Sequence, residues 1–528
     1  MAVATSEQAM TERATTLLRE LVRERRLTIR EAMAVLQARA DELDEPGYAL
    51  SERQFRRWMA GDVTSLANAR AANVRVVEDE FGWPIEALLG TDNRPELPAP
   101  SPPALSGRTL QTEQLVGWVA THSEVSFSEA YSSVARGADR IDGVPALTQA
   151  ASAHVASRVD RLRVTDALGA YYGGDPRFYA ATVGDHVVST SLVVQPGWTG
   201  LAIPLGGGAE RFERSQARTP RPIRLNRRQA GAALERLASV EATGTVLVNN
   251  PVFDLNAINI DGGRIAGELG AAEFAAYALT ADLLEGELQS VLAQSTRNLR
   301  HASTPLRDGW LPTIEHALDI RSRLCTGGPV CLVAISEGDH YRLLVQERSP
   351  QVLNGTGMLS VIPKAFHQPL SDMPGDVALS ATIERELEEE LFGRPDVEQL
   401  GAGGGRRVAP LHPERASGPM RWLHDHPDAW RMECTSFGIN MVSGNYEFAC
   451  LVAVHDPEWW QRFGHLLEAN WEADRMHSVS SLDADALTQL VDDPRWSNEG
   501  LFAFVEGLRR LAEIDPNGVS PAMAGSRS

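Results

Sequence analysis

Three glutamates within one short acidic stretch have a spacing that could hold a metal ion. Glu386, Glu389 and Glu390 are related by i, i+3 and i+4, so on a helix they share one face. Crowded like charges cost stability unless a cation compensates, and carboxylate oxygens suit hard ions such as Mg²⁺ or Mn²⁺. Arg385 can pair with a glutamate three or four residues later. The alternative is an amphipathic helix whose charged face is simply exposed to water.

The elements around this stretch predict an α/β region that would position it. A β-hairpin is expected over 329–347 because two apolar runs flank a Glu-Gly-Asp turn. A strand over 358–363 precedes the acidic helix, 445–454 is expected to be a buried strand, and 500–514 a closing helix. The acidic helix presents an apolar stripe that could pack on the sheet. Its members are Leu379, Ile383, Leu387 and Leu391.

This order of elements, together with the motif REL-E-EE, resembles the Nudix domain, whose box reads G-x5-E-x7-R-E-U-x-E-E-x-G-U. The matching positions are Arg385, Glu386, Leu387, Glu389 and Glu390. The resemblance implies that the three glutamates would ligate Mg²⁺ or Mn²⁺, which would activate water against a pyrophosphate. In that case these glutamates and Arg385 would be the catalytic set of a Nudix-type pyrophosphohydrolase.

Several positions depart from the Nudix box. Val377 stands where the upstream Glu would be, Ser371 where the leading Gly would be, and Phe392 where the Gly after the acidic pair would be. The loop before the helix reads PKAFHQP rather than PGG, and it holds Lys364, the only lysine of the chain. Lys364 could bind a phosphate of a ligand, or it could be solvated, as lysines usually are. These departures favour ligand sensing over hydrolysis.

A second set of polar residues has a spacing that could read DNA. The stretch SERQFRRWMAG begins with a capping serine and ends at Gly61, which predicts a short helix. Phe55, Trp58 and Met59 would face a core, leaving the polar side chains to enter a major groove. These are Ser51, Arg53, Gln54, Arg56 and Arg57. The alternative is a helical bundle with an exposed, arginine-rich face.

The N-terminal helices resemble the Cro/C1-type (XRE) helix-turn-helix of bacterial regulators. The resemblance rests on S-x-R-x-F-x-R-W-x-x-G, followed by a helix ending FGWPIEALLG. It implies that the helix over 51–59 is the recognition helix and that double-stranded DNA is a partner. Met59 stands where that family usually has Glu, and ELDEPGYAL is inserted before the recognition helix.

We expect a multidomain protein, with an all-α helix-turn-helix domain, a mixed α/β middle domain and an α/β/α Nudix-like C-terminal domain. The expected ranges are 12–90 for the DNA-binding domain, 91–109 for a Pro-rich linker, 110–300 for the middle domain, 301–515 for the Nudix-like domain and 516–528 for a disordered tail. Within the middle domain, residues 211–228 hold seven arginines, which could bind phosphates or line an exposed loop.

Composition limits the class of protein further. The net charge of −20 opposes DNA binding in general, so DNA contact would need a local basic surface. The four cysteines include no C-x-x-C pair, which favours reduced thiols. We find no apolar run that predicts a membrane span and no secretory signal, so we expect a cytoplasmic protein. The predominance of arginine is typical of GC-rich genomes such as those of actinobacteria.

Taken together, the sequence predicts a DNA-binding transcriptional regulator of the actinobacterial type that senses a nucleotide-like or phosphorylated small molecule. A homodimer is expected because such readers match two half-sites. One alternative is a Mg²⁺-dependent Nudix hydrolase of a nucleoside diphosphate derivative that carries an accessory DNA-binding domain. A third hypothesis is a scaffold that recruits other proteins through its middle region.

Overall fold

The structure is a computed structural model. It describes residues 15–25, 27–43, 45, 47–61, 69–81, 85–92, 107–142, 160–215, 223–243, 247–294, 303–349, 357–369, 374–392, 406–407, 416–467 and 473–523. The chain forms two compact units. The first comprises residues 1–101 with the segments 369–376 and 395–417, and the second comprises the remainder.

The first unit is built from short helices around its own apolar core. The helices are α1 (Leu17–Glu24), α2 (Ile29–Glu42), α3 (Glu52–Met59), α4 (Ala71–Phe81) and α5 (Ile85–Leu88). Two-residue strands β1 (Thr15–Thr16), β2 (Thr91–Asp92) and β12 (Arg406–Arg407) pair beside them. Leu18, Leu36, Phe55, Val77 and Leu88 are buried in the core. Each such side chain contributes about 1.5–3 kcal/mol by leaving water, so the helical periodicity of the sequence accounts for this unit.

Local signals fix the ends of these helices where the sequence predicts them. Thr28 and Glu31 form a capping box: the Thr28 hydroxyl accepts from the Glu31 backbone N–H, and the Glu31 carboxylate accepts from the Thr28 backbone N–H at 2.8 Å. The Ser51 hydroxyl accepts from the Gln54 backbone N–H at 3.2 Å at the start of α3. Gly61 ends that segment with a φ of 67°, a conformation that favours glycine.

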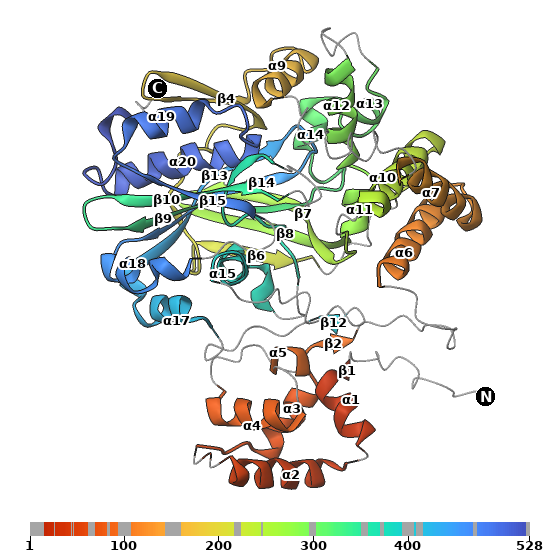
Figure 1. Ribbon diagram of the computed structural model, residues 1–528, viewed down its shortest axis with the longest axis vertical. Helices are drawn as coiled ribbons and strands as arrows, with labels where there is room; N and C mark the ends of the chain where they lie inside the picture. Colours follow the sequence, from red (N-terminus) through yellow and green to blue (C-terminus); the bar gives the residue numbers. More distant parts are fainter. Residues whose placement is uncertain are drawn as a thin grey trace, which may run out of the picture. The chain divides into compact units, whose positions relative to one another are not determined.

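The second unit contains the remaining elements (Figure 1). Its main helices are α6 (Gly107–His122), α7 (Phe127–Asp142), α9 (Arg161–Tyr171), α10 (Arg227–Thr243), α11 (Phe274–Ala278), α12 (Leu283–Gln294), α13 (Pro305–Trp310), α14 (Ile314–Leu318), α15 (Leu379–Glu390), α17 (Gly418–Asp425), α18 (Pro457–Phe463), α19 (Ala484–Asp492) and α20 (Asn498–Ile514). Its strands are β3 (Phe178–Val183), β4 (His186–Val193), β5 (Ile203–Pro204), β6 (Glu210–Arg214), β7 (Pro251–Asp261), β8 (Arg264–Glu273), β9 (Gly327–Ser336), β10 (Tyr341–Arg348), β11 (Leu359–Val361), β13 (Trp430–Asn440), β14 (Tyr446–Val454) and β15 (Ala473–Ser480).

A curled nine-stranded sheet organises this unit. Its main order is β11-β10-β9-β14-β13-β4-β3, with β15 on β10 and β5 on β13. Figure 1 shows α19 and α20 over one side of this sheet, with α15 and α18 toward the other. The side under α20 is filled by large apolar residues such as Leu332, Leu343, Leu451, Phe502 and Phe504. The hairpin β9–β10, the strand β11, the helix α15, the buried strand β14 and the helix α20 all form where the sequence predicts them.

The expected separation of a middle domain from a C-terminal domain at residue 300 differs from the structure. Strands from both ranges share one sheet, because β13 pairs with β4 at Ile439–Val193 and with β5 at Cys434–Ile203. Residues 102–368 and 418–528 accordingly fall within one compact unit. Pairing between strands more than 200 residues apart leaves no local trace in the sequence, so composition could not reveal it.

A smaller sheet of order β6-β8-β7 lies within the same unit. The stretch GTVLVNN at 244–250 is typical of a strand in the sequence but does not form one as such: Leu247–Asn250 is irregular, residues 244–246 lie outside the described part, and β7 begins at Pro251. The sequence also predicts a helical run from about Ala271 to Leu299, but its first residues belong to β8, and helix begins at Phe274. The long hairpin β7–β8 was therefore not predicted.

The tail also differs from the expectation of disorder. Val519 and Met523 are buried against the main core, and a short 3₁₀ helix spans Pro521–Met523. Residues 524–528 lie outside the described part, as does most of the expected linker, of which Thr91–Asp92 forms β2 and 107–109 open α6. Among the described residues, no helix combines the length and the apolar character that crossing a membrane requires.

Candidate functional site

The α3 helix has two distinct faces. Phe55 and Trp58 are buried in the core of the first unit, and Met59 packs against that core. The polar residues expected to face DNA are exposed or partly exposed on the other side; these are Ser51, Arg53, Gln54, Arg56 and Arg57. Arg56 forms an exposed i,i+4 pair with Glu52, which adds little stability and is readily exchanged for another anion. The polar face of α3 is therefore opposite its buried apolar face, as the sequence predicts.

The α15 helix is buried on both sides. Its apolar stripe packs as the sequence predicts; Leu379, Ile383, Leu387 and Leu391 are all buried. Most of its charged residues are buried too: Arg385, Glu388, Glu389 and Glu390 each expose less than a tenth of their surface, whereas Glu384 and Glu386 are partly exposed. The alternative of a water-exposed charged face is therefore wrong.

The start of α15 is held by a carboxylate from another strand. Glu210 on β6 accepts hydrogen bonds from the backbone N–H groups of Leu379 and Ser380, which open the helix. The same side chain accepts from the Gly206 N–H at 3.1 Å. A carboxylate at this position satisfies N–H groups that have no partner within the helix and complements the helix dipole.

Two of the three glutamates of the Nudix-like box accept hydrogen bonds from other residues of the chain. Glu386 accepts from Arg385 at 2.7 Å, whereas Glu390 accepts from the Lys364 backbone N–H at 3.1 Å. Across the described residues, no group of three His, Cys, Asp or Glu side chains is arranged to hold a metal ion. Divalent ions of this kind need several oxygen ligands around one centre.

Two glycines position Lys364. A Cβ atom on Gly328 would lie 2.1 Å from the Ala365 carbonyl oxygen, and one on Gly327 would lie 1.8 Å from that of Tyr446. Only glycine permits this close approach of three backbone segments. The loop that begins at Lys364 therefore runs directly beside β9, where the His367 N–H donates to the Gly327 carbonyl at 2.7 Å.

Lys364 is the centre of a buried polar network. Its ammonium group forms an ion pair with Glu499 in the first turn of α20. The Asn440 side-chain amide donates to Glu499 at 3.1 Å and to Glu447 on β14 at 3.5 Å. Since the Lys364 backbone also binds Glu390, this one residue connects α15 with α20. The Lys364 side chain is only 21 % exposed, so the alternative of a solvated lysine does not hold.

The pKa values of Glu447 and Glu499 are shifted in opposite directions. Burial raises the pKa of Glu447 to about 8, with a further rise from the neighbouring Glu499. Burial also acts to raise the pKa of Glu499, but the charge and hydrogen bond of Lys364 outweigh it and hold that pKa below its ordinary value. Near neutral pH these shifts favour the protonated form of Glu447 and the ionised form of Glu499.

Glu447→Gln will stabilise the second unit at alkaline pH. Folded Glu447 stays protonated up to about pH 8, whereas in the unfolded chain it ionises near 4.5. Its stabilising contribution is therefore complete below pH 4.5 and is lost as the pH rises to about 8. We expect the variant to raise the unfolding free energy by about 2–4 kcal/mol at pH 8 and to change it little at pH 4.5. Hydrogen exchange of the β14 amides measures this locally.

The exposed Glu458 of α18 offers the matched control for that measurement. Glu458→Gln removes the same charge from a side chain that is half exposed, so we expect no change in the pH dependence of β14 exchange. Identical pH profiles for the wild type and Glu447→Gln would show that Glu447 does not retain its proton.

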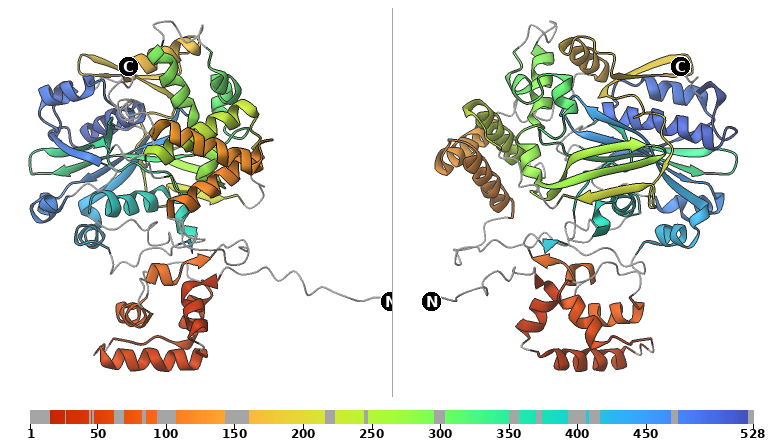
Figure 2. Two further views of the ribbon diagram at one scale, coloured as in Figure 1. Left: turned by 45° about the vertical axis from the view of Figure 1, so that its right-hand side comes forward. Right: turned by 180° about the vertical axis from the view of Figure 1, so that it is seen from behind.

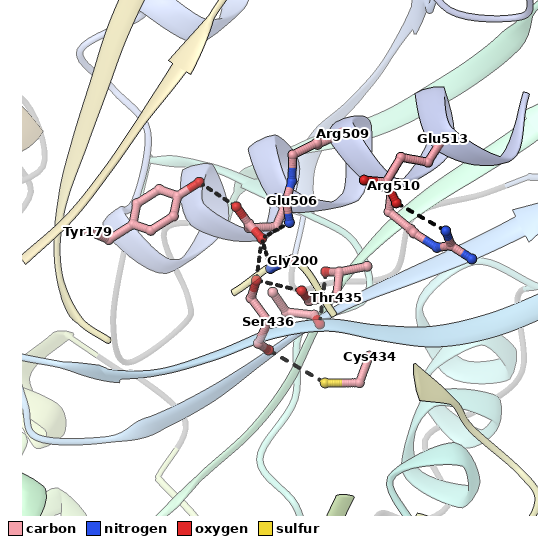
Figure 3. Close-up of polar contacts among 10 residues, drawn as sticks. Tyr179, Gly200, Cys434, Thr435, Ser436, Glu506, Arg509, Arg510 and Glu513 are labelled. Carbon is pink, nitrogen blue, oxygen red and sulfur yellow. Dashed lines mark hydrogen bonds and ion pairs between the residues drawn. The ribbon is translucent and has the colours of Figure 1, made fainter. Parts of the chain in front are cut away.

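A second buried carboxylate, Glu506, is fully occupied by hydrogen bonds (Figure 3). It accepts from the Tyr179 hydroxyl at 2.9 Å, the Gly200 N–H at 3.1 Å, the Arg509 guanidinium at 2.7 Å and the Ser436 hydroxyl. Burial raises the pKa of Tyr179 well above its ordinary value, so the phenol remains a donor. Since Ser436 is completely buried, we interpret this cluster as structural support that joins β3, β13 and α20.

Sequence reasoning included Lys364 among the site residues but missed its partners. Glu447 interrupts the apolar run NYEFACLVAV, and Glu506 interrupts GLFAFVEGL. A carboxylate in a fully apolar run is informative because glutamate is rarely buried without a partner. That signal could have identified both residues, although it could not have identified the partners.

A comparison with models of known protein families gives no match, and a comparison with curated proteins gives none either.

Proposed function

We propose that this protein is a DNA-binding transcriptional regulator whose larger unit senses a nucleotide-like or phosphorylated small molecule. The observation that carries the proposal is the two-sided α3 helix: Phe55 and Trp58 hold it in the core, and its arginines project outward. A short helix held in this way, with arginine and glutamine side chains exposed, has the chemistry required for the major groove. Two copies of the unit in a homodimer would read two half-sites.

The charge balance argues for recognition by a local surface. Residues 12–90 contain 12 arginines and 14 acidic residues, so the range as a whole is close to neutral in a chain of net charge −20. On α3 itself, three arginines accompany the single Glu52. Phosphate contacts would therefore concentrate on α3, and the rest of the protein would repel DNA.

The proposal is tested by salt-dependent binding of full-length protein to duplex DNA. We expect fluorescence anisotropy to show binding that weakens by about a hundredfold or more between about 50 and 200 mM salt, because counterions are released from each contacted phosphate. Genomic fragments that bind more tightly than random duplex would identify operators. The absence of any salt-sensitive binding would contradict the proposal.

The alternative function is a Mg²⁺- or Mn²⁺-dependent Nudix hydrolase of a nucleoside diphosphate derivative with an accessory DNA-binding domain. The observation in its favour is the order β9–β10, β11 and α15 with the residues Arg385, Glu386, Glu389 and Glu390. We expect weak or no phosphate release by the purified protein with these ions, because its described carboxylates do not gather around one centre. Robust turnover that is lost in Glu389→Gln would favour the hydrolase.

A further inference from the structure

A pocket of about 400 Å³ lies on the three-stranded sheet β6-β8-β7. Its lining residues are Arg211, Asn259, Asp261, Gly262, Arg264, Ile265 and Ala266. The right-hand view of Figure 2 shows these three strands at the front of the second unit. Of the candidates discussed above, only Arg211, the first of the seven arginines in 211–228, lines it. A volume of this size accommodates a small polar metabolite.

The register of the strands creates the pocket. Ala266 on β8 pairs with Arg211 of the parallel neighbour β6 and with Asn259 of the antiparallel neighbour β7. Paired residues point to the same face of a sheet, so these three side chains form one row. Because alanine is small, the middle of the row is hollow, with a guanidinium group on one side and an amide on the other.

A tight turn closes one end of the hollow. Asp261 and Arg264 form the last pair of the β7–β8 hairpin and are joined by Gly262 and Gly263, whose φ angles are 56° and 74°. Positive φ at both central residues is typical of the two-residue hairpin turn that matches the twist of a sheet. Arg264 lies two residues before Ala266 and therefore on the same face, so it presents a second guanidinium group to the pocket.

The opposite face of the sheet anchors it to the core. Phe212 lies between outward-facing neighbours and packs against Phe448 of β14, with ring centroids 5.8 Å apart, and Ile265 is fully buried. Arg211 and Arg264 are exposed, and within the described chain neither forms an ion pair. The Arg211 Nε donates to the Gly208 carbonyl at 3.3 Å, which leaves the rest of the guanidinium group for a ligand.

We propose that this pocket binds a phosphorylated sugar, either free or as part of a mononucleotide. Two guanidinium groups in one pocket suit a phosphate, which accepts paired hydrogen bonds from arginine. The next outward-facing row contains Glu213 paired with Glu268, so the same face offers carboxylates to sugar hydroxyl groups. These neighbouring carboxylates oppose the binding of a long polyanion along this face, and Asp261, as the single carboxylate that lines the pocket, provides too few ligands for a metal ion.

The inference gives the ligand-sensing half of the proposed function a site and a ligand class. It rests on the proposed function only for the consequence that the ligand alters DNA affinity. Ligand binding is measured without DNA, so failure of one proposal does not imply failure of the other.

Isothermal titration calorimetry of the full-length protein tests whether the pocket binds a phosphorylated sugar. The three probes are glucose 6-phosphate, adenosine monophosphate and inorganic phosphate. Ala266→Leu fills the hollow without changing charge, and Arg264→Ala removes one guanidinium group. Arg228→Ala is the matched control, because it removes an exposed arginine of α10 that is outside the pocket. We expect binding of at least one of the two phosphorylated sugars to the wild type and to Arg228→Ala, weakened about tenfold or more in the two pocket variants.

Tighter binding of glucose 6-phosphate would indicate a free sugar phosphate as the ligand, and tighter binding of adenosine monophosphate would indicate a mononucleotide. The proposal is overturned if neither binds, if inorganic phosphate binds as tightly as both, or if Ala266→Leu and Arg264→Ala bind like the wild type. Unfolding temperatures of both variants identify any loss of folding, and the two variants change the pocket by independent means.

Discussion

Replacing Arg53 and Arg57 together with alanine is expected to weaken the proposed duplex binding by about ten- to a hundredfold near physiological salt. The two residues are four positions apart on α3 and therefore lie on the same exposed face. Each phosphate contact that is lost reduces the slope of log affinity against log salt by about 0.9, so the double variant loses up to about two units of slope. Anisotropy titrations at several salt concentrations measure both quantities.

A matched control separates this effect from a general loss of charge. Arg75 on α4 is exposed and pairs with Glu45, so Arg75→Ala removes a positive charge from the same unit but not from α3. We expect it to leave the salt dependence close to that of the wild type. Equal losses in Arg75→Ala and in the α3 variant would mean that α3 is not the recognition helix.

Lys364→Met destabilises the second unit by about 3–5 kcal/mol, because it leaves Glu499 buried without its cation. Burial acts to raise the pKa of Glu499, but the charge and hydrogen bond of Lys364 outweigh burial, so the pKa lies below its ordinary value. Without the lysine the folded-state pKa rises, so the destabilisation is largest above that raised value and diminishes as the pH falls. Hydrogen exchange of the α20 and β14 amides reports on this unit, since a single midpoint is poorly defined for a chain with two units.

Two further variants sharpen this experiment. Adding Glu499→Gln to Lys364→Met removes the unpaired charge, so we expect it to restore much of the lost stability. Arg495→Met breaks an exposed pair with Asp493 at 2.8 Å, and we expect a loss below about 1 kcal/mol. Similar small losses for Lys364→Met and Arg495→Met would show that Lys364 is not the compensating charge.

The local elements of both candidate sites were predictable because their signals lie within a few residues. The α3 helix is specified by Ser51 and Gln54 at its start, by Phe55 and Trp58 on one face, and by Gly61 at its end. The stripe from Leu379 to Leu391 likewise specifies α15 and the side that packs on the sheet. The apolar run of β14 predicted its complete burial. In each case side-chain periodicity determines the element and its buried face.

The polar partners could not be predicted, because they come from strands and helices that are distant in sequence. Lys364 meets Glu499 across 135 residues, and Asn440 lies between Glu447 and Glu499 only because β13, β14 and α20 pack together. The spacing of Glu386, Glu389 and Glu390 suggested convergence on an ion. In the structure, Arg385 and the backbone of Lys364 bind two of these carboxylates instead.

The sequence by itself therefore determined the helices, their capped ends, their apolar faces and the exposed arginines of α3, since each depends on residues within one or two turns. Only the tertiary structure decided that residues before and after position 300 share one sheet, that burial raises the pKa of Glu447, and that Arg211, Arg264 and Ala266 line one pocket. These features arise from strand register and from burial, which depend on segments brought together by folding of the whole unit.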